Sequence, residues 1–259
     1  MLFNDGWEFT KQPLHTGLEE IGKRYEDFYT AGLPHDWLIY HADALYEDAT
    51  GWYRKRFVCE PEEDMLVFLR FDGIYMDSRI YVNDRLAGEW KYGYSAFEID
   101  ITSYLKEGEN EIKVSVDHQS PNSRWYSGAG IFRDVWLKKV HRIHILSDGV
   151  YFHARKKEDF WEAEVETEAA GENLELRYEI KEKDADRWLP LTGEEHKTLK
   201  EAERQVYVYT FKSRIRDPKC WDVENPRCYR LKVSLYSEGK LLQEEEQTVG
   251  FCTKEFLPD

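Results

Sequence analysis

The stretch NEIKVSVDH (Asn110–His118) decides which class of fold this sequence encodes. Ile112, Val114 and Val116 occupy every second position, and polar residues fill the positions between them. A period of two is typical of a β-strand with one face in a core. LELRYEI (Leu174–Ile180) repeats the pattern. The two stretches predict half-buried antiparallel strands.

Further strand-like runs lie on both sides of these two, separated by turn chemistry such as Asn83-Asp84 and Asp148-Gly149. The runs are Tyr53–Cys59, Met65–Phe71, Ser78–Val82, Phe97–Ile101, Asp134–Val140, Val206–Phe211 and Leu231–Leu235. Short strands at this spacing favour sandwiches over parallel α/β sheets. We therefore predict an all-β chain.

Two charged stretches, Gly17–Phe28 and Thr192–Gln205, interrupt the strand pattern. Each has room for a helical turn or two, but neither carries a sustained apolar stripe of helical period. We interpret both as excursions on the surface.

The length of 259 residues, with 41% hydrophobic and 15% aromatic residues, suits two sandwiches of roughly 100 to 150 residues each. Tryptophans concentrate before about residue 140, and the later part is richer in Glu and Lys. The change falls near His141–Ser147. We predict domains at residues 1–142 and 143–259.

The charge balance excludes two classes of partner. There are 36 Lys and Arg against 51 Asp and Glu, a net charge of -15, so no basic field is available for nucleic acid or anionic lipid. The sequence has no signal-peptide pattern and no run approaching about 18 apolar residues. We expect a soluble, cytoplasmic protein whose four cysteines are reduced.

Common chemical motifs are missing as well. The sequence contains no GxSxG elbow, no HExxH helix, no P-loop and no glycine fingerprint between a strand and a helix. We therefore predict neither a cofactor nor a metal site. Paired carboxylates could cleave a glycosidic bond, but 51 acidic residues offer no spacing rule that selects a pair.

Several motifs nevertheless follow one another in a fixed order. FNDGWEF (Phe3–Phe9) precedes LPHDW (Leu33–Trp37) and GWYRKRF (Gly51–Phe57). A long stretch at Asp77–Thr102 and SRWYSGAGIFRDVWL (Ser123–Leu137) come next, and WDVENPRCYRL and VGF end the series. In this order the motifs resemble family 2 of the glycoside hydrolases, which contains β-galactosidases and β-glucuronidases. The resemblance covers essentially the whole chain.

The resemblance implies a jelly-roll, sugar-binding-like β-sandwich followed by an immunoglobulin-like β-sandwich. In the family a (β/α)₈ barrel then carries two catalytic glutamates, which cleave with retention and lie about 5 to 5.5 Å apart. That barrel would begin after Asp259, so we expect it to be missing here and expect no catalytic residue in this chain. SRWYSGAGIFRDVWL resembles the galactosidase branch more than the glucuronidase branch.

Local chemistry predicts structural roles for several conspicuous residues. Gly128 and Gly130 supply positive φ or close backbone approach, and Asp36 after Pro34 bonds local backbone amides. Arg133 and Asp134 can pair and hold their turn. His118 is interpreted as a hydrogen-bonded loop histidine, and most of the tryptophans as core anchors.

In galactosidases of the family, two jelly-roll loops reach the sugar, and the resemblance places them at Tyr46–Thr50 and Pro121–Tyr126. Asp48 stands where the first loop bonds sugar hydroxyls, and Ser123 and Arg124 stand where the second contributes a polar group. Trp125 lies in the same loop away from any alternating pattern, and an aromatic face of this kind can stack on a pyranose ring. The opposing interpretation is that both loops are ordinary solvated turns. The candidates for the substrate rim are Asp48, Ser123, Arg124 and Trp125.

The sequence leaves three functions open. The first is the non-catalytic front of a retaining exo-β-glycosidase for β-glycosides or oligosaccharides, with β-galactosides ahead of β-glucuronides. The second is a stand-alone carbohydrate-binding module, and the third is an assembly domain without a ligand. Homo-oligomeric assembly also stays open.

Overall fold

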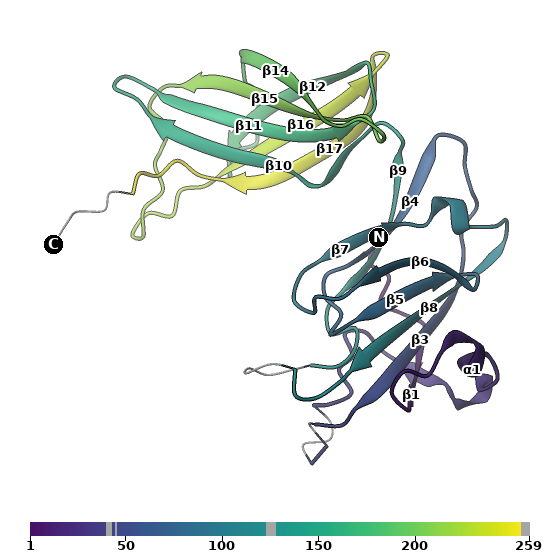
Figure 1. Ribbon diagram of the computed structural model, residues 1–259. Helices are drawn as coiled ribbons and strands as arrows, with labels where there is room; N and C mark the ends of the chain where they lie inside the picture. Colours follow the sequence, from purple (N-terminus) through teal and green to yellow (C-terminus); the bar gives the residue numbers. More distant parts are fainter. Residues whose placement is uncertain (40–42, 45, 123–127, 255–259) are drawn as a thin grey trace. The chain divides into compact units, whose positions relative to one another are not determined.

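The computed structural model describes residues 1–39, 43–44, 46–122 and 128–254 of the chain. It divides into two compact units, Met1–Val140 and His141–Asp259 (Figure 1). Each unit has its own sheets and its own hydrophobic core. Among the described residues, no helix combines the length and the apolar character that a membrane span needs.

The first unit is built from strands, one short helix and two turns of 3₁₀ helix. The helices are α1 (Leu18–Gly22), η1 (Tyr25–Asp27) and η2 (Thr102–Tyr104). The strands are β1 (Trp7–Gln12), β2 (Tyr29–Ala31), β3 (Ala49–Val58), β4 (Met65–Phe71), β5 (Ser78–Val82), β6 (Arg85–Trp90), β7 (Phe97–Asp100), β8 (Glu109–His118) and β9 (Val135–His141).

The strands of the first unit form two sheets. A six-stranded sheet has the order β2-β1-β3-β8-β5-β6, and all five of its pairings are antiparallel. A three-stranded sheet has the order β7-β4-β9. Strand β8 lies in the middle of the larger sheet, and Ala49 pairs with His118 where β3 begins and β8 ends.

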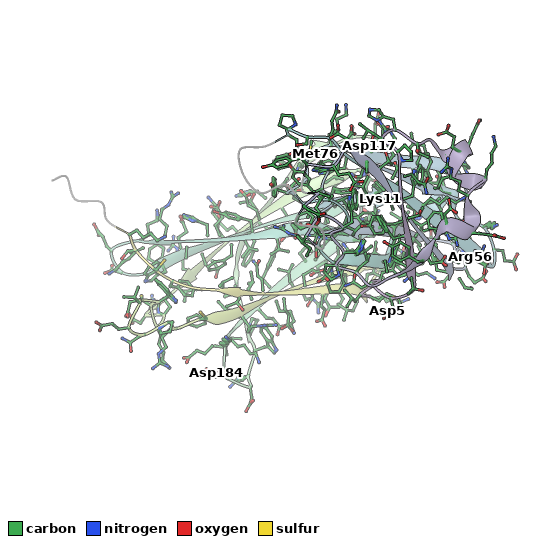
Figure 2. The ribbon with its side chains drawn as sticks, turned by 90° about the horizontal axis from the view of Figure 1, so that it is seen from below. Asp5, Lys11, Arg56, Met76, Asp117 and Asp184 are labelled. Carbon is green, nitrogen blue, oxygen red and sulfur yellow. The ribbon has the colours of Figure 1, made fainter. Side chains whose placement is uncertain are left out.

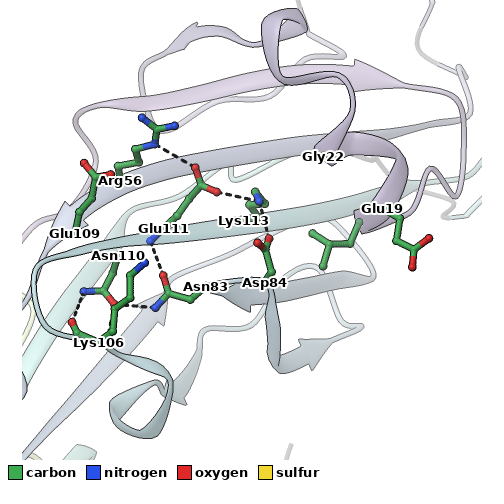
Figure 3. A pocket seen from close by; sticks show the side chains of 11 residues that line it. Glu19, Gly22, Arg56, Asn83, Asp84, Lys106, Glu109, Asn110, Glu111 and Lys113 are labelled. Atoms are coloured by element: carbon green, nitrogen blue, oxygen red, sulfur yellow. Dashed lines mark hydrogen bonds and ion pairs between the residues drawn. The ribbon is translucent and has the colours of Figure 1, made fainter.

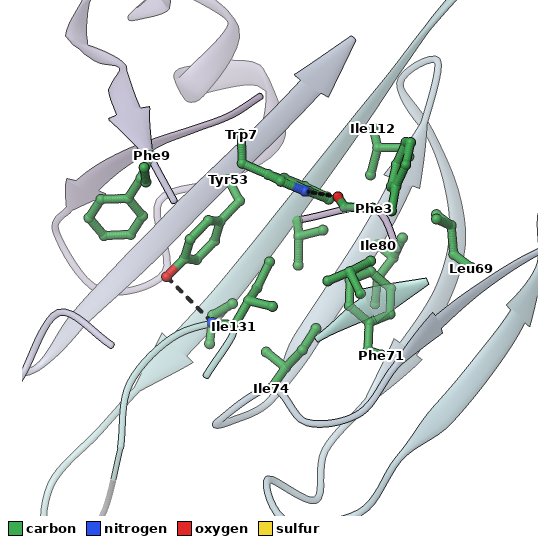
Figure 4. Packing of buried hydrophobic residues seen from close by; sticks show 14 of the residues in the cluster. Phe3, Trp7, Phe9, Tyr53, Leu69, Phe71, Ile74, Ile80, Ile112 and Ile131 are labelled. Carbon is green, nitrogen blue, oxygen red and sulfur yellow. Dashed lines mark hydrogen bonds between the residues drawn. The ribbon is translucent and has the colours of Figure 1, made fainter. Parts of the chain in front are cut away.

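The core of the first unit follows the predicted alternation. Ile112, Val114 and Val116 are fully buried, and they pack with aromatic residues of the opposite segments (Figure 4). Trp7 and Tyr53 are also fully buried, and the indole N–H of Trp7 donates to the carbonyl oxygen of Phe3 at 2.8 Å. Trp7, Trp37 and Trp52 are buried, as expected of core anchors.

The polar face of β8 is less exposed than the alternation predicts. Lys113, Ser115 and Asp117 are all buried. The segment at 13–28 accounts for part of this burial: Trp52 on the neighbouring strand donates to the carbonyl oxygen of Thr16 at 3.0 Å, and Ile21 of α1 is 1% exposed. This charged stretch is therefore partly a cover for the sheet.

The second unit consists of strands alone among its described residues. They are β10 (His144–Lys156), β11 (Trp161–Ala170), β12 (Leu174–Glu182), β13 (Leu189–Pro190), β14 (Gly193–Glu201), β15 (Val206–Ile215), β16 (Tyr229–Ser237) and β17 (Lys240–Val249). Two four-stranded sheets, β10-β11-β15-β14 and β13-β12-β16-β17, enclose the second core. The all-β class and the two successive sandwiches are confirmed.

The interpretation of Thr192–Gln205 as a surface excursion is wrong. Most of it is strand β14, which pairs with β15 from Gly193 to Glu201. It forms an edge of its sheet, and eight of its nine residues are exposed. Because neither face is buried, the strand shows no alternation that could reveal it in the sequence.

Candidate functional site

The LPHDW segment is tied to the segment before β9 by a buried carboxylate. Asp36 is 8% exposed, and its Oδ1 accepts the backbone N–H groups of Leu38 at 3.0 Å and Ala129 at 3.1 Å. The prediction that Asp36 bonds backbone amides is confirmed. Its second partner lies 93 positions away, so the carboxylate fixes one motif against the other.

Gly130 lies at the tightest point of this contact. Its φ is +125°, and a Cβ atom there would be 2.3 Å from Tyr53 Oη and 2.5 Å from the carbonyl oxygen of His35. Tyr53 Oη and His35 Nδ1 are 2.8 Å apart. Burial raises the pKa of Tyr53 well above 10 and lowers the pKa of His35, so both side chains are held neutral. The structural role predicted for this glycine is confirmed.

Arg133 and Asp134 do not form the pair that the sequence predicts. The Arg133 guanidinium points to the carbonyl oxygens of Asp72 and Tyr94, at 3.4 and 3.5 Å. Asp134 Oδ1 instead accepts from Asn4 Nδ2 at 2.8 Å. Successive residues of an extended chain point to opposite faces, which separates the two charges.

The loop before β3 is held from the end of β8. His118 is fully buried, and its Nδ1 lies 2.7 Å from the carbonyl oxygen of Glu47. A carbonyl can only accept, so Nδ1 carries the proton in this bond. Lys11 Nζ pairs with Glu47 Oε2 at 2.7 Å. His118 is thus a hydrogen-bonded histidine, as predicted, although it lies at the end of a strand.

A second attachment fixes the other end of this loop. Thr50 Oγ1 donates to Asp117 Oδ1 at 2.5 Å and accepts the backbone N–H of His15 at 2.7 Å. Asp117 Oδ2 lies 3.2 Å from His15 Nδ1 and 3.5 Å from an Arg79 nitrogen. The backbone N–H of Asp117, a residue labelled in Figure 2, donates to the carbonyl oxygen of Asp77 at 3.3 Å. The sequence gives no signal for Asp117 beyond a carboxylate at a strand end.

Asp48 of the first predicted rim loop contacts the residue that precedes the second. Asp48 is exposed, and its Oδ1 accepts the backbone N–H of Ser120 at 2.7 Å. Asn122, two residues further on, accepts a hydrogen bond from Tyr75 Oη at 3.2 Å. The structure therefore places Asp48 beside the loop that begins at Pro121. The other three candidates, Ser123, Arg124 and Trp125, lie outside the described residues.

Several buried polar atoms have no hydrogen-bond partner among the residues that the structure describes. In the first unit they include His118 Nε2 and Asn122 Nδ2, which flank Ser120 in the sequence, and also Trp37 Nε1 and Trp90 Nε1. An unsatisfied buried polar group costs roughly 1 to 3 kcal/mol, so such groups are rare unless water or a ligand completes them. Trp37 Nε1 and Asn122 Nδ2 are donors, and His118 Nε2 is a ring nitrogen that can also hydrogen-bond, so these atoms could pair with hydroxyl groups.

A polar cavity of about 710 Å³ opens on the larger sheet (Figure 3). Several of its groups are already paired: Lys113 Nζ contacts Asp84 Oδ1 at 2.6 Å and Glu111 Oε2 at 2.9 Å. Asn83 Nδ2 donates to Asn110 Oδ1 at 2.8 Å. We assign these contacts to the folding of the β5–β6 hairpin. Within the described ranges, no group of three or more His, Cys, Asp or Glu side chains could hold a metal ion.

Two family models match the chain. "Glycosyl hydrolases family 2, sugar binding domain" matches residues 23–141, and "Glycosyl hydrolases family 2" matches residues 143–251. Together the matches cover residues 23–251 except residue 142, so the first 22 residues of the first unit lie outside them.

Individual relatives carry two different activities in their names. The β-galactosidase BoGH2A of Bacteroides ovatus is 31% identical over 97% of this chain and 31% of its own length. A β-glucuronidase of Formosa agariphila is 26% identical over 99% of this chain and 30% of its own length. The crystal structure of a β-glycosidase from Bacteroides vulgatus superposes with a TM-score of 0.78 at 26% identity, over 97% of this chain and 33% of that one. The chain spans about a third of the length of these relatives.

Proposed function

Because the chain belongs to family 2 of the glycosyl hydrolases, we propose that it is the sugar-contacting front part of a retaining exo-β-glycosidase with β-galactosides as its preferred substrates. In this proposal the first unit supplies part of the rim of the active site. The two catalytic carboxylates come from outside residues 1–259, and the second unit acts as scaffold.

The observation that carries the proposal is the hydrogen bond between Asp48 and Ser120. It brings an exposed carboxylate to the segment that carries His118 and Asn122, each of which has a buried polar atom without a partner among the described residues. A sugar hydroxyl both donates and accepts, so it can satisfy groups of both kinds. The remaining carboxylate oxygen of Asp48 is available to accept from such a hydroxyl.

The preference for a galactoside over a glucuronide rests on the motif SRWYSGAGIFRDVWL (Ser123–Leu137), which resembles the galactosidase branch of the family. Because one relative is named a β-glucuronidase, β-glucuronides are the alternative substrates. Parallel assays with β-galactoside, β-glucuronide and β-mannoside decide between them.

Assayed alone, the chain of residues 1–259 is expected to turn over none of these three chromogenic substrates. The reason is that family resemblance places both catalytic glutamates beyond this sequence. The protein made from the complete reading frame is the positive control. Turnover that persists through further purification of the chain, and is abolished by mutating one of its own acidic residues, would contradict the proposal.

In the complete protein, Asp48→Ala is expected to lower kcat/KM for the preferred glycoside about tenfold, because a hydrogen bond to the transition state is lost. Arg124→Ala on the second loop is expected to act in the same direction. Asp48→Asn is the matched variant. Its amide oxygen can still accept the backbone N–H of Ser120, so this variant keeps the contact between the two segments and removes only the negative charge. Unchanged kinetics in both alanine variants, with unchanged melting temperature, would make these loops ordinary surface.

The stand-alone binding module is the alternative from another class. A complete reading frame that ends at Asp259, together with measurable binding of galacto-oligosaccharides to the chain, would favour it over the enzyme. Absence of both turnover and binding in the complete protein would leave an assembly domain.

A further inference from the structure

His118 at the end of β8 holds both chain neighbours of Asp48. The ladder between β3 and β8 ends with the pair Ala49–His118, so backbone pairing fixes the residue after Asp48. Glu47, the residue before Asp48, lies beyond this ladder, and its carbonyl oxygen is 2.7 Å from His118 Nδ1. The imidazole therefore extends the attachment of the loop by one hydrogen bond, to the other side of Asp48.

The burial of His118 shows that its side chain does more than fill space. His118 is fully buried, and a buried polar group costs free energy unless it is hydrogen-bonded. Its Nε2 has no partner among the described residues. An apolar side chain would pack at the same place without that cost. The hydrogen bond from Nδ1 to Glu47 is therefore what the imidazole adds.

The far end of the loop is held by the residue next to His118 in the sequence. Thr50 Oγ1 donates to Asp117 Oδ1 at 2.5 Å, and Asp117 is buried. Consecutive residues of a strand point to opposite faces, so Asp117 and His118 reach the loop from two sides. Asp48 is thus the exposed member of a short segment that is attached on both sides.

We propose that His118 is a positioning residue for the glycosidase reaction: through the carbonyl oxygen of Glu47 it holds Asp48 where its carboxylate meets the sugar. The inference rests on the proposed function and adds a residue that acts without touching the sugar. Groups that contact a transition state must be held to within about 0.5 Å, and a displacement of about 1 Å can lower a rate about a hundredfold. Loss of the bond to Glu47 should therefore be visible in the kinetics.

Two variants in the complete protein separate the hydrogen bond of His118 from its packing. His118→Leu keeps an apolar side chain and removes the donor, and it is expected to lower kcat/KM for a chromogenic β-galactoside about tenfold. His118→Asn should retain most of the rate, because its amide nitrogen is attached to Cγ as Nδ1 is and can donate to the same carbonyl. An equal fall in both variants would overturn the proposal, and so would wild-type kinetics in His118→Leu.

A double-mutant cycle with Asp48→Ala shows whether His118 acts through Asp48. If it does, His118→Leu should cause no further fall in kcat/KM when it is added to Asp48→Ala, since no carboxylate is left to position. Two falls that multiply would show that His118 acts independently of Asp48, and would overturn the proposal. If His118→Leu does not fold, His118→Gln replaces it in the cycle, because its longer side chain is polar but does not carry a nitrogen on Cγ.

The matched control is His144→Leu in the second unit. His144 is 5% exposed, and its Nδ1 lies 3.2 Å from the carbonyl oxygen of Arg142, so it is a buried histidine beside a backbone carbonyl as well. Its replacement should leave kcat/KM unchanged. A tenfold fall in His144→Leu would mean that losing any buried histidine lowers the rate, and would remove the case for His118.

The same set of proteins separates this inference from the function on which it rests. If the complete wild-type protein does not hydrolyse β-galactosides, the proposed function is wrong and the role of His118 falls with it. If the wild type is active and Asp48→Ala has unchanged kinetics, the contact between Asp48 and the sugar is wrong. If Asp48→Ala is impaired and His118→Leu is not, only the positioning role of His118 is wrong.

Discussion

Replacing Gly130 with alanine is expected to lower the free energy of unfolding of the first unit by roughly 4 kcal/mol. The backbone at +125° disfavours any residue with a side chain, and the new Cβ atom would collide with Tyr53 Oη and with the carbonyl oxygen of His35. The second atom belongs to the backbone, so no rotamer change relieves the collision. Chemical denaturation followed by hydrogen exchange in each unit measures the loss.

Gly108→Ala is the matched control in the same unit. Gly108 also has a positive φ, +81°, but no atom lies within 4 Å of the place where a Cβ would stand. Its replacement should cost only about 1 kcal/mol, the penalty for the dihedral alone. If Gly130→Ala costs no more than Gly108→Ala, the close approach is not what demands glycine.

The sequence predicted the central strands better than the edges. The run Ser78–Val82 coincides with β5, in which buried and half-buried residues alternate. The run Met65–Phe71 coincides with β4, an apolar stretch in which Val67, Phe68 and Leu69 are buried in succession. Strand β14 was missed, since it is exposed on both sides and its Glu and Lys residues look like a loop. Backbone pairing with β15 stabilises this exposed edge strand. Such pairing does not require apolar residues at every second position, so the sequence shows no strand pattern here.

The candidate site was predictable only in part. Family resemblance pointed to Asp48 and to the loop after β8, and both lie in one hydrogen-bonded contact. The supports of that contact were not predictable, because they join distant positions: His118 holds Glu47 across 71 positions, and Thr50 meets Asp117 across 67. Local patterns report strands and turns, whereas these bonds depend on the register of β3 against β8.

Phe251→Ala is expected to destabilise the second unit by roughly 3 to 5 kcal/mol. Phe251 is fully buried although it follows the last strand, and its ring meets three others edge to face. The centroid distances are 5.7 Å to Phe152, 5.6 Å to Trp161 and 5.2 Å to Tyr229. Removing the ring opens a cavity between strands of both sheets and also removes the edge-to-face contacts.

Hydrogen exchange with mass-spectrometric readout, performed across a denaturant series, reports each unit separately. Phe251→Ala should shift the protection of β11 and β16 to lower denaturant and leave β3 and β8 unchanged, because each unit closes its own core. The reciprocal variant is Phe71→Ala, a fully buried ring that stacks on Phe97 at 5.2 Å in the first unit. It should shift β3 and β8 alone. A shift of both units in either variant would mean that the two cores unfold as one cooperative body.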